Sequence, residues 1–122
     1  DGTERQKVRA AGVLRNLSDN DDNSVAIAAA GGVEVLISLA RDGTERQKVR
    51  AAGVLRNLAM NDDNRVAIAA AGGVEVLVSL ARDGNERQKE RAAGALWNLS
   101  DNDDSSVAIA AAGGVEVLIA LA

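Results

Sequence analysis

Apolar side chains recur with helical spacing in residues 44–59, near the middle of the chain. They lie three or four residues apart and share one face of a predicted helix, at positions Ala51, Val54, Leu55 and Leu58. The opposite face carries Arg, Gly and Asn. Thr44 is followed three positions later by Gln47, a pairing that forms a capping box at the start of a helix. We therefore expect a long helix whose apolar face is turned toward the core.

Two shorter helices are predicted next. Residues 65–71 are rich in Ala and follow two candidate N-caps, Asp63 and Asn64. They end at Gly72, which suits the left-handed turn after a helix. Residues 74–82 fit two patterns, because their β-branched side chains partly alternate as in the strand of a β-α repeat. The apolar spacing favours a helix and leaves the strand as the alternative; the positions are Val74, Leu77, Val78 and Ala81.

The same pattern is written three times. A run beginning at Asp1 returns at Asp42 and again, with Asn85 in place of Thr, at Asp83, so the period is 41 residues. A period of this length is typical of a solenoid, in which each unit buries its apolar faces against its neighbours. The copies are nearly identical, which indicates a recent duplication or a designed sequence.

Composition argues against catalysis and cofactors. The 122 residues include no His, Cys or Tyr, and Trp97 is the only aromatic residue. Residues 19–23 have the spacing that opens a calcium loop, but Ser24 replaces the required Gly and no Glu closes the loop. We therefore expect no enzyme activity, no metal and no cofactor.

Charge and hydropathy limit the partners. The net charge of −4 is unfavourable for a general nucleic-acid-binding protein. No unbroken apolar run of about 18 residues is present, so no membrane partner is expected. We expect a soluble protein, of intracellular origin or designed, whose compartment the sequence does not determine.

The 41-residue unit resembles an armadillo repeat of the beta-catenin and plant type. The resemblance is carried by residues 64–74, for a short first helix and an angled second helix, and by residues 91–100, for a long third helix. It implies an all-α, right-handed armadillo-type solenoid in which the helices appear in permuted phase. In this register residues 1–18 are a third helix alone, 19–59 and 60–100 are full repeats, and 101–122 supply first and second helices. No polar capping repeat is recognisable.

The resemblance implies a groove along the third helices that binds an extended peptide. The family position that holds the peptide backbone corresponds to Asn16, Asn57 and Asn98. An Asn amide offers one acceptor and two donors, which suits a peptide group, although an Asn near a helix end also caps or solvates it.

Arginines lie on or beside the stripe of the third helices that carries these Asn residues. They suit an acidic peptide, because a guanidinium group binds a carboxylate through two hydrogen bonds. The candidate contacts are Arg9, Arg15, Arg50, Arg56 and Arg91, with Arg5, Arg46 and Arg87 beside them. Simple solvation of a helix face is the alternative. Trp97 replaces Arg15 and Arg56 in its copy and is a candidate anchor for a ligand.

The glycines in the third helices distinguish this chain from one branch of the family. Importin-like repeats carry Trp where this chain has Gly12, Gly53 and Gly94, so a nuclear-localisation signal is not the expected ligand. A mid-helix Gly costs roughly 1 kcal/mol relative to Ala, so we expect a reason for it. Close approach of neighbouring backbones is the favoured reason, and a smooth groove floor is the other.

Self-association is the second hypothesis for function. In the family register the two ends of the chain are complementary parts of one repeat, which would pair in a symmetric dimer or a head-to-tail oligomer. The apolar residues expected in this contact are Val8, Leu14, Leu17, Val115, Leu118, Ile119 and Leu121.

Overall fold

The structure, a computed structural model, describes residues 6, 9–10, 12–13, 25–27 and 31–121. Over these residues the regular structure is helical and no strand occurs. The helices are α3 (Gly32–Asp42), α4 (Glu45–Leu58), α5 (Asp62–Ala70), α6 (Gly73–Asp83), α7 (Glu86–Leu99), α8 (Asp103–Ala111) and α9 (Gly114–Leu121). Residues 74–82 therefore form a helix, as predicted, and the strand alternative is wrong.

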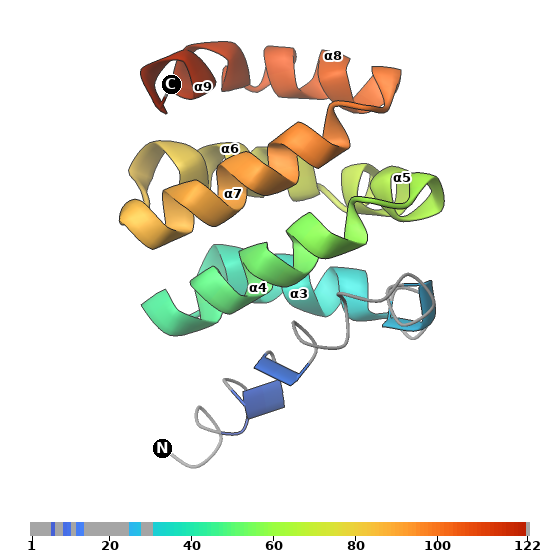
Figure 1. Ribbon diagram of the computed structural model, residues 1–122, viewed down its shortest axis with the longest axis vertical. Helices are drawn as coiled ribbons and strands as arrows, with labels where there is room; N and C mark the ends of the chain where they lie inside the picture. The colour runs from blue at the N-terminus through green and yellow to red at the C-terminus, as the bar shows by residue number, and fades with distance from the viewer. Residues whose placement is uncertain (1–5, 7–8, 11, 14–24, 28–30, 122) are drawn as a thin grey trace.

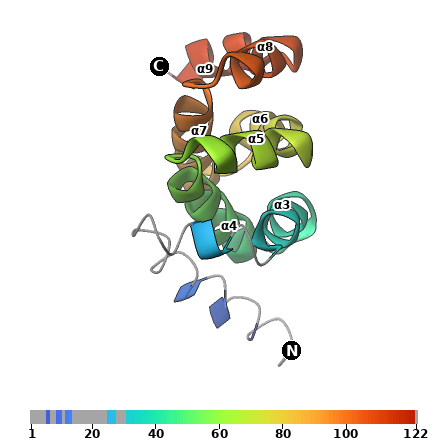
Figure 2. The ribbon, with the colours of Figure 1, turned by 90° about the vertical axis from the view of Figure 1, so that its right-hand side faces the viewer.

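The helices stack along one direction (Figure 1). The long helices α4 and α7 pack against each other, while α3 packs against α4 and α6 against α7. Seen from the side, α4 and α7 lie on one side of the stack and α3 and α6 on the other (Figure 2). Helices α8 and α9 form the layer at the end of the stack in Figure 1. Equivalent helices of successive repeats thus lie side by side.

Glycine turns the chain sharply between the first and second helices of each repeat. The bend is 81° between α5 and α6 and 87° between α8 and α9. Gly72 and Gly113 lie at these bends with φ of 82°, a left-handed conformation that glycine adopts without strain. The predicted role of Gly72 is confirmed.

In the described part of the chain, no single helix is long and apolar enough to cross a membrane. Two bent helix pairs, α5 with α6 and α8 with α9, meet that test only jointly, by length and composition.

The starts of α4 and α5 test the capping predictions. At α4, the Gln47 N–H donates to the Thr44 hydroxyl at 3.2 Å and the Thr44 N–H donates to the Gln47 side chain at 2.9 Å, so the capping box is confirmed. At α5 the predicted start and cap are wrong: Asn61 is the N-cap and accepts from the Asn64 N–H at 3.1 Å. The helix therefore begins at Asp62. The two acidic side chains of its first turn interact favourably with the positive end of the helix dipole.

The core consists of aliphatic side chains from both sides of the stack. Val54, Leu55 and Leu58 of α4 are fully buried, as the helical spacing predicted. They pack in one cluster with the buried apolar stripes of the second helices, at positions Val33, Leu36, Ile37, Val74, Leu77 and Val78. On the opposite face of α4, Arg46 is exposed and Arg50 and Arg56 are half-buried, whereas Gly53 and Asn57 are buried.

Candidate functional site

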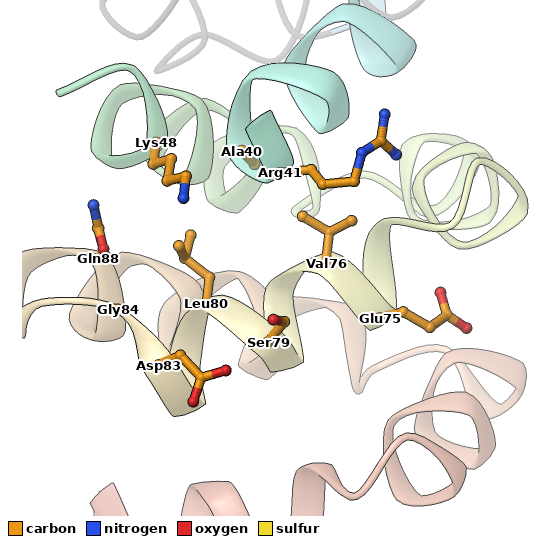
Figure 3. Close-up of a pocket in the computed structure, with 10 residues that line it drawn as sticks. All are labelled: Ala40, Arg41, Lys48, Glu75, Val76, Ser79, Leu80, Asp83, Gly84 and Gln88. Atoms are coloured by element: carbon orange, nitrogen blue, oxygen red, sulfur yellow. The ribbon is translucent and has the colours of Figure 1, made fainter. Parts of the chain in front are cut away.

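Two hollows open on opposite sides of the stack. The first has a volume of about 320 Å³ and lies where α3 and α6 meet (Figure 3). Its charged lining residues balance, with Arg41 and Lys48 facing Glu75 and Asp83 across the opening. The Arg41 guanidinium also donates to Asp42 at 3.0 Å. This mixed lining selects neither an anion nor a cation.

The second hollow, here called the arginine hollow, lies between the N-terminal halves of α4 and α7. It has a volume of about 470 Å³ and is lined by Glu45, Arg46, Val49, Arg50, Asn85, Arg87 and Arg91. The arginines come in pairs four residues apart on each helix, and the pairs are one repeat apart. Four arginines and one glutamate therefore line the hollow. One of the four, Arg91, is already paired with Glu90, so the lining keeps a net positive charge within a chain of net charge −4.

Arg91 is half-buried and already paired with a neighbouring acid. Its Nη1 donates to the Glu90 carboxylate at 3.0 Å, and its side chain is largely buried. Its Nε is buried and has no hydrogen-bond partner among the described residues. An unpaired buried donor is costly, so this group lowers the stability of the packing around it.

Hydrogen bonds between helices use part of the Asn stripe. Asn98 Nδ2 donates to the Arg56 carbonyl at 2.8 Å, and Gln88 Nε2 donates to the Glu45 carbonyl at 3.2 Å. These bonds join α7 to α4 near both of their ends. The Asn98 amide therefore has a structural role that the sequence did not indicate, and one of its donors is committed within the chain. Asn57 is only 9% exposed.

The group that approaches Gly94 most closely from the preceding repeat is a side chain and not the backbone. A Cβ on Gly94 would lie 2.7 Å from Arg56 Cδ, so the Arg56 side chain runs over the glycine. The expected close approach of backbones is wrong here. The space left by the missing Cβ is filled by an arginine stem from the preceding repeat.

The remaining predicted site residues are dispersed. Trp97 is 77% exposed, and Arg9 is exposed on the part of the N-terminal segment that the structure describes. Of the apolar residues expected in self-association, Val115, Ile119 and Leu121 are exposed on α9 and Leu118 is partly buried. The others among the predicted site residues lie outside the described residues: Val8, Leu14, Arg15, Asn16 and Leu17.

Arg65 is a structural residue that the sequence interpretation missed. Its guanidinium group donates to the Ala59 carbonyl at 2.7 Å and to the Met60 carbonyl at 3.2 Å, and it pairs with Asp62. It also lies 3.5 Å from an Asp101 carboxylate oxygen in the next repeat. Arg65 thus fixes the turn after α4.

The next copy of the repeat satisfies the same carbonyl with a different residue. Ser106 stands where the middle copy has Arg65, and its hydroxyl donates to the Ser100 carbonyl at 2.7 Å. That carbonyl is the counterpart of the Ala59 carbonyl, so both residues satisfy the same acceptor.

Residues 20–60 and 61–101 each match the sequence model of the armadillo/beta-catenin-like repeat, and together they cover more than half of the chain. The chain belongs to the armadillo repeat family. The armadillo scaffold is a non-enzymatic protein-binding fold. Among the described residues no group of three or more acidic, His or Cys side chains is arranged to hold a metal ion.

Several solved structures similar to this armadillo chain are engineered proteins. One engineered protein is 41% identical with a TM-score of 0.89, over 95% of this chain and 48% of that protein. Two designed armadillo repeat proteins, one of them in complex with the peptide (KR)4, are each 24% identical with a TM-score of 0.92, over 99% of this chain and 52% of theirs. The chain thus spans about half the length of these relatives. A search of curated proteins gave no match.

Proposed function

We propose that the groove along α4 and α7 binds an extended acidic peptide segment and that the arginine hollow receives its carboxylates. The observation that carries this proposal is the excess of arginines in the hollow: four line it against one glutamate, and Glu90 pairs with one of the four. A guanidinium group offers a planar fork of donors that matches a carboxylate in geometry and charge.

The charge of the ligand distinguishes this chain from one of its designed relatives. That relative is in complex with (KR)4, a peptide of alternating cations. The groove proposed here is lined with cations, and Gly94 stands where importin-like repeats carry Trp. A basic peptide would be repelled by such a surface, whereas an acidic one is attracted.

Asn98 would contact the peptide backbone with its Oδ1 and its second N–H, which are not used in the bond to α4. One of its two N–H donors is committed to the Arg56 carbonyl, and none of the described residues donates to its Oδ1. This oxygen can accept from a peptide N–H. Because Asn98 also joins two helices, its replacement would change both binding and packing, so arginine variants give the cleaner test.

The test is titration calorimetry with the peptides (DE)4 and (KR)4. We expect (DE)4 to bind, with an affinity that falls as salt is added, and (KR)4 not to bind. Arg87→Glu should weaken binding of (DE)4 by about tenfold, equivalent to ~1.4 kcal/mol. Arg82→Glu is the matched control, because Arg82 is exposed on α6 outside the hollow and its replacement alters the net charge equally.

Three results would contradict the proposal. Equal losses in Arg87→Glu and Arg82→Glu would mean that only the net charge of the protein matters. Tighter binding of (KR)4 than of (DE)4 would mean that the site prefers a basic peptide. Displacement of (DE)4 by a single-stranded oligonucleotide at lower concentration would identify a phosphate backbone as the preferred ligand.

A further inference from the structure

Helix α9 exposes an apolar face that its two internal copies bury. Ile119 is 70% exposed, whereas its counterparts Ile37 and Val78 are 3% and 1% exposed. The same contrast separates exposed Val115 from buried Val33 and Val74. Nearly identical sequences thus differ in burial because of what lies beside them, and α9 lies at the end of the stack (Figure 1).

A third helix covers each of the buried copies. Helix α4 packs on α3 and α7 packs on α6, whereas α9 packs mainly against α6 and α8. The uncovered face of α9 is therefore complementary to a third helix. Residues 113–121 differ from residues 31–39 only by Ala120 in place of Ser38, which is exposed, so the face is the same one that α4 covers on α3.

We propose that a second copy of the chain covers α9 with its own residues 3–17. These residues have the same sequence as residues 44–58, which form α4 and its N-cap. The contact would reproduce the interface between α3 and α4 with the same side chains. Leu14 of the second copy would take the place of Leu55, which is fully buried in that interface.

Trp97 supports this contact independently. Within the chain, the Arg56 side chain runs over Gly94 of the next repeat. Trp97 holds the position of Arg56 one repeat later, and Gly12 of a second copy would hold the position of Gly94. Trp97 is 77% exposed, so its indole ring is available to cover that glycine. An exposed aromatic side chain at this position fits a contact between copies.

A hydrogen bond would be reproduced as well. Gln88 Nε2 donates to the Glu45 carbonyl, which joins successive third helices. In the proposed contact, Gln6 of the second copy is the counterpart of Gln88, and the Glu86 carbonyl is the counterpart of the Glu45 carbonyl. Each copy carries both halves of the contact, so the association is head-to-tail and extends beyond a dimer unless it closes into a ring.

Light scattering across a concentration series tests the proposal with two matched variants. The mass should rise above twice 12.5 kDa for the unchanged chain and stay at 12.5 kDa for Ile119→Asp. Val107→Asp is the control, because Val107 is also 70% exposed but its counterpart Val66 is 57% exposed in a repeat with neighbours on both sides. It should associate like the unchanged chain. Circular dichroism checks that both variants are folded.

Mixing distinguishes head-to-tail from symmetric contacts. Leu14→Asp and Ile119→Asp should each remain monomeric, while an equimolar mixture should form a dimer with one intact interface and blue-shifted Trp97 emission. Gly12→Leu provides a second N-terminal variant if Leu14→Asp loses helix, because a Cβ on Gly12 meets nothing closer than Arg50 at 4.0 Å.

Two results would overturn the proposal. One is a monomer at every concentration of the unchanged chain. The other is a dimer that survives Leu14→Asp and Gly12→Leu, which would mean that α9 pairs with α9 of another copy.

Discussion

At the scale of the residue, glycine serves three purposes in this fold. Gly72 supplies a left-handed turn, Gly73 allows close packing at the start of α6, and Gly94 leaves room for the Arg56 side chain. Only the first follows from backbone conformation. The other two depend on the neighbour that a Cβ would meet, which is a rigid core side chain for Gly73 and a flexible stem for Gly94.

Alanine substitutions separate these roles. Gly94→Ala should leave the free energy of unfolding unchanged or raise it by up to about 1 kcal/mol, because helix propensity improves and the Arg56 stem can move. Gly73→Ala should lower it by about 1–3 kcal/mol, since the new Cβ would lie 2.5 Å from Ile68 Cγ2 and 2.8 Å from the Ile68 carbonyl oxygen. Urea unfolding measures both; a loss for Gly94→Ala as large as that for Gly73→Ala would show that the Arg56 stem cannot yield.

At the scale of the element, the N-caps decide where helices begin. The polar run before α5 offers several residues that can cap, and the sequence pattern favours Asp63 or Asn64. The structure selects Asn61, whose extended backbone lets its side chain accept from the Asn64 N–H. Asn102 does the same for α8, where it accepts from the Ser105 N–H at 3.0 Å.

This assignment predicts unequal effects of two neighbouring substitutions. Asn61→Ala should lower the free energy of unfolding by about 1 kcal/mol, because it leaves a helix N–H without its acceptor. Asp63→Ala should cost only a few tenths, since the exposed carboxylate interacts with the helix dipole alone. Chemical denaturation of the two variants decides between the caps: an equal cost would contradict the assignment to Asn61.

The helices and the core were predictable because they depend on local periodicity and on short-range capping pairs such as Thr44 with Gln47. The arginine hollow was only partly predictable. Its arginines were visible as a stripe, but their meeting required residues 41 positions apart to lie side by side. The Asn98 bond to the Arg56 carbonyl could not be predicted, because a backbone acceptor leaves no mark on the sequence of its own residue.

At the scale of the whole molecule, stability depends on position in the stack more than on sequence. Helices α6 and α9 share most of their residues, yet α6 buries Val74, Leu77 and Val78 while α9 buries Val117 among its large side chains. Each apolar side chain that a neighbour covers contributes about 1.5–3 kcal/mol. Local opening should therefore require less free energy at the end of the stack than within it.

Hydrogen exchange measures this difference. In dilute solution the amide protons of α9 should exchange at least about tenfold faster than those of α6, because one lost burial already exceeds ~1.4 kcal/mol. Raising the protein concentration should slow exchange in α9 and leave α6 unchanged if a second copy covers α9. Equal protection of α6 and α9 in dilute solution would show that opening is global, and that position in the stack has no effect.

The hydrogen bonds from Gln88 and Asn98 to α4 also set the spacing of the third helices along the proposed groove. They join α7 to α4 near both ends of these helices, which opposes splaying of the pair and sliding of one helix along the other. The distance from one repeat to the next along the proposed groove is therefore set by the protein. If the groove binds as proposed, an extended ligand would have to match that spacing, and a longer ligand would gain affinity in steps, one for each further repeat that it reaches.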